Sequence, residues 1–432
     1  MSNIKRVVLF LPALVWLSAF NAQAGVDYLI ITTDALKPTF QTLADHRAAF
    51  DGFATEVRTI ASITGAYGGV DTQAKIRACI TDYFTTQNLQ YVVLGGDNTV
   101  VPTRSCKVSS GSSTETNMPT DLYYSGLDGT WDENGNGVYG EADTAAGDEG
   151  DLAYDVVVGR IPVETASQAA GYINKVISYD NNPPLSIARK FIMSGNEAWD
   201  KYTDASRPSD LLNDGHLQFA DRNHPAASDV EIWVRRAYRD NVQAKVWSAT
   251  TLGCLFDSLT SWDTSTAGNY AASSANMKTR FSEGWNFSLN FTHGNTTVIG
   301  AEGDSFSSST AASMTGMMIH FYTGACLSGA FDKAEPSLSE AMLRNPNGGC
   351  LVYLGCSRYG WGSPGSTVGG PSAAYMTSWL TCVFGNRTPV SGKAFADHKQ
   401  AKAGNCASNG ANRWIQFGLN FQGDPAIKFG SW

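Results

Sequence analysis

The sequence predicts an α/β protein whose mostly parallel sheet is covered by helices on both faces. Short apolar runs recur along the chain and end in Gly or a small polar residue, as buried parallel strands do. The runs are 27–32, 53–58, 91–96, 155–159, 191–195, 285–291, 318–322 and 350–354. Helical patterns such as Thr72–Gln87 and Ser167–Tyr179 lie between them, and this alternation is typical of α/β folds. The composition, 43% hydrophobic and 16% charged with 43 Gly in 432 residues, fits a folded, loop-rich chain and excludes a coiled coil or a collagen.

The first residues have the pattern of a secretory signal. Lys5 and Arg6 precede an apolar stretch over residues 7–20, and small residues end the segment at Ala24. We therefore predict a signal peptide over 1–24 and a secreted, periplasmic or cell-surface protein after cleavage near Ala24. The apolar stretch is short for a spanning helix, which needs about 20 residues, although an uncleaved anchor remains the alternative. We expect no transmembrane segment in the mature chain.

Two further features concern the organisation and the partners of the chain. The Asn181-Asn182-Pro183-Pro184 run ends a helix, so we predict an N-terminal α/β subdomain over 25–184 and a C-terminal one over 185–432. Near the end, Gly423-Asp424-Pro425 predicts a turn followed by a short strand. The net charge of −9 and the lack of any basic run exclude a general nucleic-acid binder.

An acidic, glycine-rich segment has the spacing of a calcium loop. Residues 108–159 contain eleven Asp or Glu and no Lys or Arg. Within them, oxygen side chains stand at positions 1, 3, 5 and 12 of an EF-hand-type loop, with Gly at 6 and a backbone oxygen at 7. In order these are Asp132, Asn134, Asn136 and Asp143, with Gly137 and Val138. The pattern favours a structural calcium ion, and a solvated Asx/Gly turn without an ion is the alternative.

The chain has eight cysteines, in a compartment that permits disulfides. No CxxC pair occurs, which argues against a structural zinc site. Cys350 and Cys356 bracket a predicted strand, where about 3.3 Å per residue would separate their Cα atoms by about 20 Å. We therefore expect these two not to pair, because a bridge needs Cα atoms within about 7 Å.

Two predicted strands end in residues that carry chemistry. The first ends in Thr292-His293-Gly294, and the second in Thr323-Gly324-Ala325-Cys326. Ligands bind beyond the carboxyl ends of parallel strands, so a thiol and an imidazole can meet there. The imidazole can take the thiol proton and later protonate a leaving amine. The N–H groups of Gly294 and Cys326 can form an oxyanion hole. His320 lies inside an apolar strand and is expected to be a core histidine.

These residues resemble the catalytic region of the gingipain family of cysteine peptidases, which belongs with caspases and legumains. The similarity extends over nearly all of residues 25–432, through Leu94-Gly-Gly-Asp97, Tyr154–Pro162 and Gly423-Asp424-Pro425. The resemblance implies a caspase-like sandwich of two α/β subdomains, with Cys326 as nucleophile, His293 as general base and no catalytic cofactor. It also implies that Asp155 orients the histidine, although from the residues alone Asp155 could be a calcium-loop neighbour or a strand-edge carboxylate.

The resemblance further places Tyr359 and Trp361 in the substrate groove, although Trp361 could equally be a buried anchor of that loop. The acidic residue that would select Arg or Lys is not identified, so basic specificity stays open. The leading hypothesis is a secreted cysteine endopeptidase that acts on proteins or peptides through a thioester. Its alternatives are a catalytically silent, calcium-stabilised binding or adhesion module and a transpeptidase that uses the same thioester.

Overall fold

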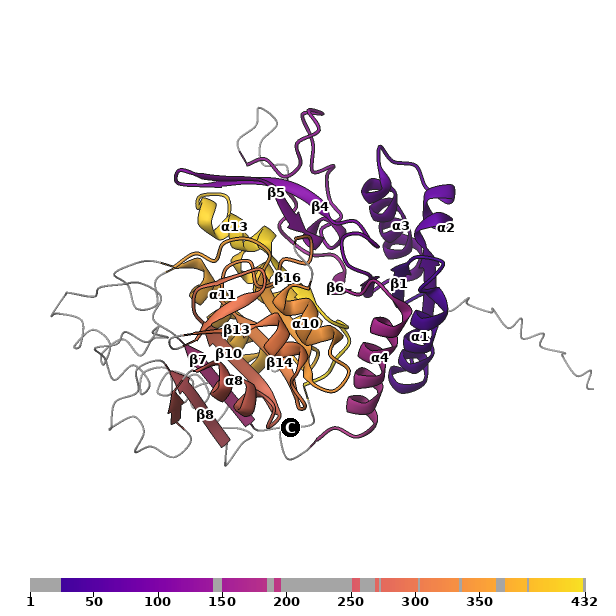
Figure 1. Ribbon diagram of the computed structural model, residues 1–432. Helices are drawn as coiled ribbons and strands as arrows, with labels where there is room; N and C mark the ends of the chain where they lie inside the picture. The colour runs from indigo at the N-terminus through magenta and orange to yellow at the C-terminus, as the bar shows by residue number, and fades with distance from the viewer. Residues whose placement is uncertain are drawn as a thin grey trace, which may run out of the picture.

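The computed structural model describes residues 25–142, 150–184, 190–195, 251–256, 269–271, 273–301, 304–333, 336–362, 370–386 and 388–429. The predicted signal peptide and Asp143, one predicted calcium ligand, lie outside these residues. In Figure 1 the N-terminal helices stand on one side of the molecule, and the orange and yellow C-terminal elements stand on the other. Within the described ranges, no helix is long and apolar enough to cross a membrane.

Eleven strands form one sheet. In spatial order they are β2 (Thr55–Thr59), β1 (Tyr28–Thr32), β3 (Tyr91–Gly95), β6 (Val157–Ile161), β16 (Leu419–Gln422), β15 (Gly349–Cys356), β14 (Met317–Thr323), β10 (Trp285–Phe291), β7 (Lys190–Gly195), β8 (Thr251–Phe256) and β9 (Asn269–Ala271). Neighbouring strands are parallel except for β16 and β15, which are antiparallel. This pair divides the sheet into two halves that run in opposite directions. The start of β6 therefore lies at the same edge as the ends of β14 and β10.

Helices cover both faces because the strands are apolar on both faces. In β1, Tyr28 and Ile30 belong to the core that includes α1 (Lys37–Asp51) and α4 (Ala166–Asn181). Leu29 and Ile31 point the opposite way, into the core with α2 (Ile60–Ala66) and α3 (Thr72–Gln87). The sequence prediction of an α/β fold with a mostly parallel sheet is therefore confirmed.

The second half is covered in the same way. Phe281 of α8 (Ser274–Phe281) packs edge-on against Phe321 of β14. Trp379 of α11 (Pro371–Leu380) packs against Phe287 of β10 on the opposite face. The remaining elements are α9 (Ser308–Ala312), α10 (Leu338–Arg344), α12 (Ser391–Ala403), α13 (Gly410–Gly418), the short helices η1 (Asp121–Tyr124) and η3 (Thr381–Gly385), the hairpin β4 (Arg104–Ser110) and β5 (Ser113–Thr120), and the small sheet β11 (Gly294–Asn295), β12 (Val298–Ala301) and β13 (Asp304–Ser307).

Several boundaries agree with the sequence, and one prediction is wrong. The strand predicted over 285–291 and the helix predicted over 72–87 have those bounds in the structure. The prediction of a strand after the Gly423 turn is wrong, because the strand precedes the turn and lies in the middle of the sheet as β16. Residues 424–429 contribute only an isolated bridge between Lys428 and Val390. The sequence pattern of β16 is a weak indication of a strand, because β16 has only four residues and two of them, Asn420 and Gln422, are polar.

A buried cluster of charges joins α1 to the segment after β16. Arg47 is fully buried, and its guanidinium lies 2.8 Å from Asp424, 2.8 Å from Asp51 and 2.9 Å from Asp180. The Tyr28 hydroxyl donates a second hydrogen bond to Asp424, at 2.8 Å. One guanidinium thus contacts three carboxylates that lie almost entirely outside solvent, while Lys428 also pairs with Asp51 and His46 with Asp180. The cluster fixes the last described segment of the chain onto the first helix.

Candidate active site

The ends of β10 and β14 bring the His-Gly and Cys segments together. The two strands are parallel neighbours with Asn290 opposite Thr323, so His293 and Cys326 each stand three residues beyond a paired position. A Cβ atom added to Gly294 would lie 2.9 Å from the Cβ of Ala325 and 3.2 Å from the carbonyl oxygen of Cys326. Gly294 therefore packs directly against the Cys326 backbone, and only glycine fits there. The predicted meeting of the two segments at the sheet edge is a feature of this structure.

The hairpin after His293 holds the backbone of this residue. Its carbonyl oxygen accepts a hydrogen bond from the N–H of Gly300 on β12, at 2.8 Å. The side chain of His293 is exposed. An exposed imidazole at the rim of the sheet can exchange protons with solvent and with a bound substrate. This position therefore suits a general base.

The other histidine on these two strands is excluded as a base. His320 is fully buried on β14, and burial lowers its pKa to about 3. Its ring nitrogens are 3.0 Å from the Asn286 carbonyl oxygen and 2.6 Å from the Ser391 hydroxyl. Both nitrogens thus have partners, and the ring stays neutral at physiological pH. The prediction of a core histidine is confirmed.

Cys326 has an environment that suits a nucleophile. Its side chain is half-buried, and the N–H of Gly360 points to its sulfur at 3.3 Å. Burial raises the pKa of the Cys326 thiol, while the Gly360 hydrogen bond acts in the opposite direction by stabilising the thiolate. A thiol with a raised pKa is mostly protonated near neutral pH, so it needs a base to remove the proton.

The other described cysteines lack such access. The seven cysteines whose side chains the structure describes are free thiols, and all of these except Cys326 are buried. Burial raises the pKa of both Cys350 and Cys356 to about 12. Such thiols are inert packing groups. The structure agrees with the expectation that Cys350 and Cys356 do not pair, because both are free.

The turn after Cys326 is held in an uncommon conformation. Leu327 has φ of 55°, in the left-handed region that leucine seldom adopts. Its N–H donates to the Arg358 carbonyl oxygen at 2.8 Å, which ties this turn to the loop after β15. Strained residues of this kind persist where the surrounding structure fixes them, and they are common at functional sites.

Aromatic side chains flank the same loop. Tyr359 and Trp361 stand on either side of Gly360, and Tyr359 is 53% exposed. Its ring stacks on Trp414 of α13, with centroids 6.1 Å apart and planes 2° apart. Trp361 contacts Trp414 edge-on at 5.5 Å. Both predicted groove residues therefore belong to the loop whose Gly360 N–H contacts the Cys326 sulfur. The sequence did not single out Gly360 or Trp414, although a glycine between two aromatic residues was a usable signal.

We expect Gly360→Ala to lower activity about tenfold or more, the cost of weakening one hydrogen bond to a charged group. A Cβ at this position would lie 2.4 Å from the Gly324 carbonyl oxygen, so the loop must shift and its N–H must leave the sulfur. Gly404→Ala is the matched control, because a Cβ there meets no atom within 4 Å. The measurement is the hydrolysis rate per folded molecule. Equal rates for the two variants would contradict the role of the Gly360 N–H.

Asp155 precedes a strand in the other half of the sheet from His293. Asp155 precedes β6, and β16, β15 and β14 separate β6 from β10, about 19 Å at about 4.8 Å per strand. Its carboxylate accepts a hydrogen bond from the Leu127 N–H at 2.7 Å, and it faces the charge of Arg77 on α3. Because the strand direction reverses between β16 and β15, Asp155 lies on the side of the sheet where β10 and β14 end. It belongs, however, to the half of the sheet that contains β6. Its contacts are those of a residue that orders the 125–128 loop.

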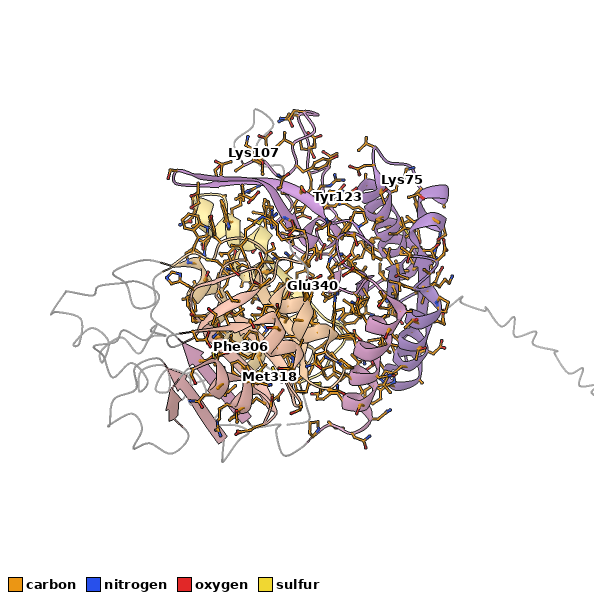
Figure 2. All side chains as sticks on the ribbon, viewed as in Figure 1. Lys75, Lys107, Tyr123, Phe306, Met318 and Glu340 are labelled. Atoms are coloured by element: carbon orange, nitrogen blue, oxygen red, sulfur yellow. The ribbon has the colours of Figure 1, made fainter. Side chains whose placement is uncertain are left out.

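The predicted calcium loop is compact and folds onto its own backbone. Both oxygens of Asp132 accept hydrogen bonds from backbone N–H groups, those of Asn136 and Gly137, at 2.9 and 3.0 Å. The Asn136 side chain also donates to Glu141 at 2.7 Å. Glu141 pairs with Lys107 of β4, which lowers the pKa of Glu141. Lys107 is labelled in Figure 2. The side-chain oxygens of this loop thus converge, as either a calcium loop or an Asx turn requires.

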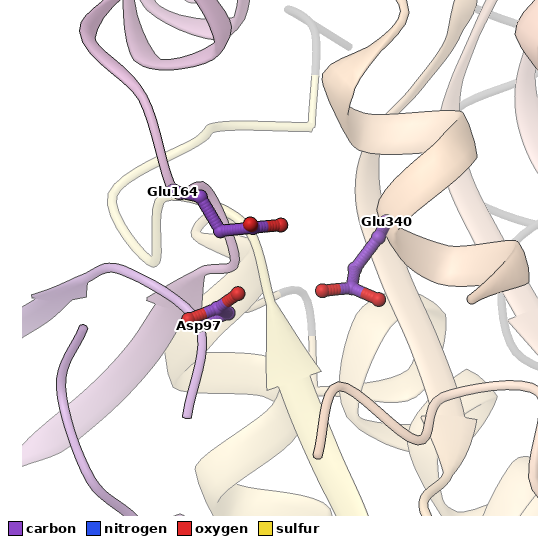
Figure 3. Close-up of side chains that lie close together, drawn as sticks. All are labelled: Asp97, Glu164 and Glu340. Carbon is purple, nitrogen blue, oxygen red and sulfur yellow. The ribbon is translucent and has the colours of Figure 1, made fainter. Parts of the chain in front are cut away.

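A separate acidic cluster joins α10 to the segments that follow β3 and β6. Figure 3 shows Asp97, Glu164 and Glu340 converging, with carboxylate oxygens within 4.8 Å of one another. Arg344 lies 3.4, 2.6 and 2.7 Å from these three carboxylates. Glu340 also caps its own helix by accepting from the Ser337 N–H at 2.9 Å. These ion pairs and the helix cap explain why the three carboxylates lie together, and they link α10 to the segments after β3 and β6.

Comparison with known proteins places this geometry in a family. The model of peptidase family C25 matches residues 21–430. No curated protein matches the chain. Among solved structures, the complex of Porphyromonas gingivalis RgpB pro- and mature domains has a TM-score of 0.65 at 14% identity, over 93% of this chain and 79% of that chain. The Arg-specific cysteine proteinase gingipain R (RgpB) gives 0.63 at 14% identity, over 94% and 79%.

These structural neighbours establish the fold, and the family match covers nearly the whole chain. A half-buried thiol beside a His-Gly segment at the edge of the sheet is the geometry that such a peptidase requires. The chain therefore belongs to peptidase family C25, the gingipain family of cysteine peptidases.

Proposed function

We propose that the protein is a secreted cysteine endopeptidase with Cys326 as nucleophile and His293 as general base. The observation that carries this proposal is the position of Cys326. Among the seven cysteines whose side chains the structure describes it alone is not buried, and the residue after His293 packs against its backbone. Together these features put a reachable thiol beside the segment that carries the imidazole, as nucleophilic catalysis requires.

The proposed reaction has two halves. His293 takes the Cys326 proton, and the sulfur attacks the carbonyl carbon of the scissile peptide bond. The carbonyl oxygen becomes negative, and the N–H groups of Gly294 and Cys326 are the donors proposed to stabilise it. The imidazolium then protonates the leaving amine, the C–N bond breaks and a thioester remains. In the second half His293 removes a proton from water, hydroxide attack on the thioester releases the acid and the Cys326 thiolate, and the imidazolium returns its proton to the sulfur.

The substrate is proposed to be a polypeptide that lies along the loop after β15. The exposed face of Tyr359 and the half-buried Trp361 offer an apolar surface next to the nucleophile. Both rings pack against Trp414, which fixes their orientation. Such an aromatic surface would contact the stem or backbone of a substrate residue and does not itself select a charge.

The experiment that tests this proposal is alkylation of Cys326 by iodoacetamide as a function of pH, in the wild type and in His293→Ala. We expect the wild type to react at neutral pH because His293 takes the thiol proton. In His293→Ala the rate at neutral pH should fall. It should then rise with pH through a midpoint above about 8.5, the value of an ordinary thiol, because burial raises the pKa of Cys326.

A peptide probe with a thiol-reactive group provides the second readout, mapped by mass spectrometry. Labelling at Cys326 that requires His293 supports an endopeptidase. No labelling of the wild type would favour the catalytically silent binding or adhesion module instead. An amide product formed with an added amine acceptor would identify a transpeptidase. The first residue of the exported protein, expected near Gly25, tests secretion.

We further propose that the loop over 132–143 binds calcium as a structural ion. Support comes from the spacing of its oxygen ligands and from the inward turn of Asp132 and Asn134 toward the Asn136 N–H, at 2.9 Å each. We expect added calcium to raise the melting temperature of the wild type by mass action. Asp132→Ala should abolish this increase, whereas Asp304→Ala, at an exposed acidic residue of β13, should keep it. The same calcium response in both variants would place the ion elsewhere.

A further inference from the structure

A row of polar side chains lies on one face of β10. Trp285, Phe287 and Leu289 alternate with Asn286, Ser288 and Asn290, and all six are buried. Polar residues on a buried face need partners, because an unpaired polar group away from water costs stability. The last of the row, Asn290, is 1% exposed and lies three residues before His293.

Asn290 forms hydrogen bonds to both neighbouring strands. Its side-chain oxygen accepts from the Thr323 hydroxyl of β14 at 2.7 Å, and its side-chain nitrogen donates to the Ser194 hydroxyl of β7 at 2.8 Å. Its backbone oxygen accepts from the Gly324 N–H at 3.0 Å. One side chain therefore links three adjacent strands at the edge that carries the proposed site.

The hydroxyl of Thr323 extends this network to the nucleophile. It accepts a hydrogen bond from the Ala325 N–H at 3.0 Å, and Ala325 directly precedes Cys326. A hydroxyl has one proton, which here points to the Asn290 oxygen. The amide group of Asn290 is thereby oriented, since its nitrogen must face Ser194. Each hydrogen bond in the series from Ser194 through Asn290 and Thr323 to Ala325 thus fixes the donor direction of the next.

We propose that Asn290 and Thr323 are positioning residues that set the geometry of His293 relative to Cys326, an inference that rests on the proposed function. Asn290 holds the strand that carries the base, and Thr323 holds the turn that carries the nucleophile. Ala325 is also the residue against which Gly294 packs. Displacement of reacting groups by about 1 Å can reduce a rate about 100-fold, so a link this close to both groups should control catalysis.

Thr323→Val tests the inference because valine has the shape of threonine and lacks the hydroxyl. We expect alkylation of Cys326 by iodoacetamide at pH 7 to slow about 10- to 100-fold. The pH profile should shift toward that of His293→Ala, since the imidazole no longer reaches the thiol. Thr323→Ser restores the hydroxyl, and its rate and pH profile should return toward those of the wild type.

Ser288→Ala is the matched control. Ser288 lies on the same face of the same strand, and within the described part of the chain its buried hydroxyl has no hydrogen-bond partner. Its loss should leave the alkylation rate unchanged. Melting temperatures of all variants show whether each is folded, so a purely structural effect would lower stability without moving the pH profile of the folded protein.

The outcomes separate the two proposals. If alkylation of the wild type does not depend on His293, the proposed function fails. If it depends on His293 but Thr323→Val reacts with the rate and pH profile of the wild type, the endopeptidase stands and the positioning role is wrong. An equal loss in Thr323→Val and Thr323→Ser would also overturn the inference, because the hydroxyl would then not be the cause.

Discussion

Cys326→Ala should abolish peptide hydrolysis and leave the fold intact. A methyl group cannot attack a carbonyl carbon or form a thioester, so no alternative route to the acyl intermediate remains at this position. The fold should tolerate the change because the side chain is only half-buried at a strand end, and its sulfur receives one hydrogen bond, from Gly360. The measurement is hydrolysis of a quenched fluorescent peptide library, alongside the melting temperature.

Cys382→Ala provides the control for this experiment. Cys382 is a buried thiol whose pKa is raised by burial to about 11, which makes it a packing group. This variant should lose some stability through the cavity it creates and should keep its activity per folded molecule. Hydrolysis by Cys326→Ala near the wild-type rate would rule out Cys326 as the nucleophile.

Arg47→Met should lower the free energy of unfolding by about 3–5 kcal/mol, the usual cost of removing one partner from a buried ion pair. Methionine fills much of the same space but leaves Asp51, Asp180 and Asp424 without their shared cation. The measurement is chemical denaturation at neutral pH. The hydrolysis rate per folded molecule should not change, because Arg47 lies on α1, which packs on β1 and β2 in the half of the sheet that does not carry Cys326.

Lys428→Met is the matched control for charge. Lys428 also pairs with Asp51, at 2.6 Å, but its side chain is 50% exposed. An exposed ion pair contributes about 0–1 kcal/mol, so this variant should unfold nearly as the wild type does. Equal stability losses for Arg47→Met and Lys428→Met would show that burial does not determine the contribution of this cluster.

The sequence predicted those parts of the fold whose signals are local. The apolar run over 285–291 and the helical pattern over 72–87 are long enough to determine their own structure. The approach of the His293-Gly294 segment to the Cys326 segment followed because each lies just beyond an apolar run on one of two neighbouring strands. The polar alternation of Asn286, Ser288 and Asn290 within an apolar strand was an unused local signal of the network beneath these residues.

The features that sequence did not predict depend on distant contacts. Asn420 and Gln422 make β16 look like a loop, yet both are buried, because their side chains donate to the carbonyl oxygens of Pro119 and Gly329. The position of Asp155 depends on which half of the sheet receives β6. A strand pattern carries no information about that choice, so the sequence alone could not place Asp155 relative to His293.

The reversed pair at the centre of the sheet has a consequence for the order in which the protein folds. β16 is formed by residues 419–422, which a ribosome adds after every other strand of the sheet. Until they emerge, β6 and β15 both present unpaired backbone groups, and unpaired strand edges promote aggregation. The two halves of the sheet can form early, but they can join only through this last strand. Closure of the whole sheet therefore waits until synthesis of the chain has almost ended.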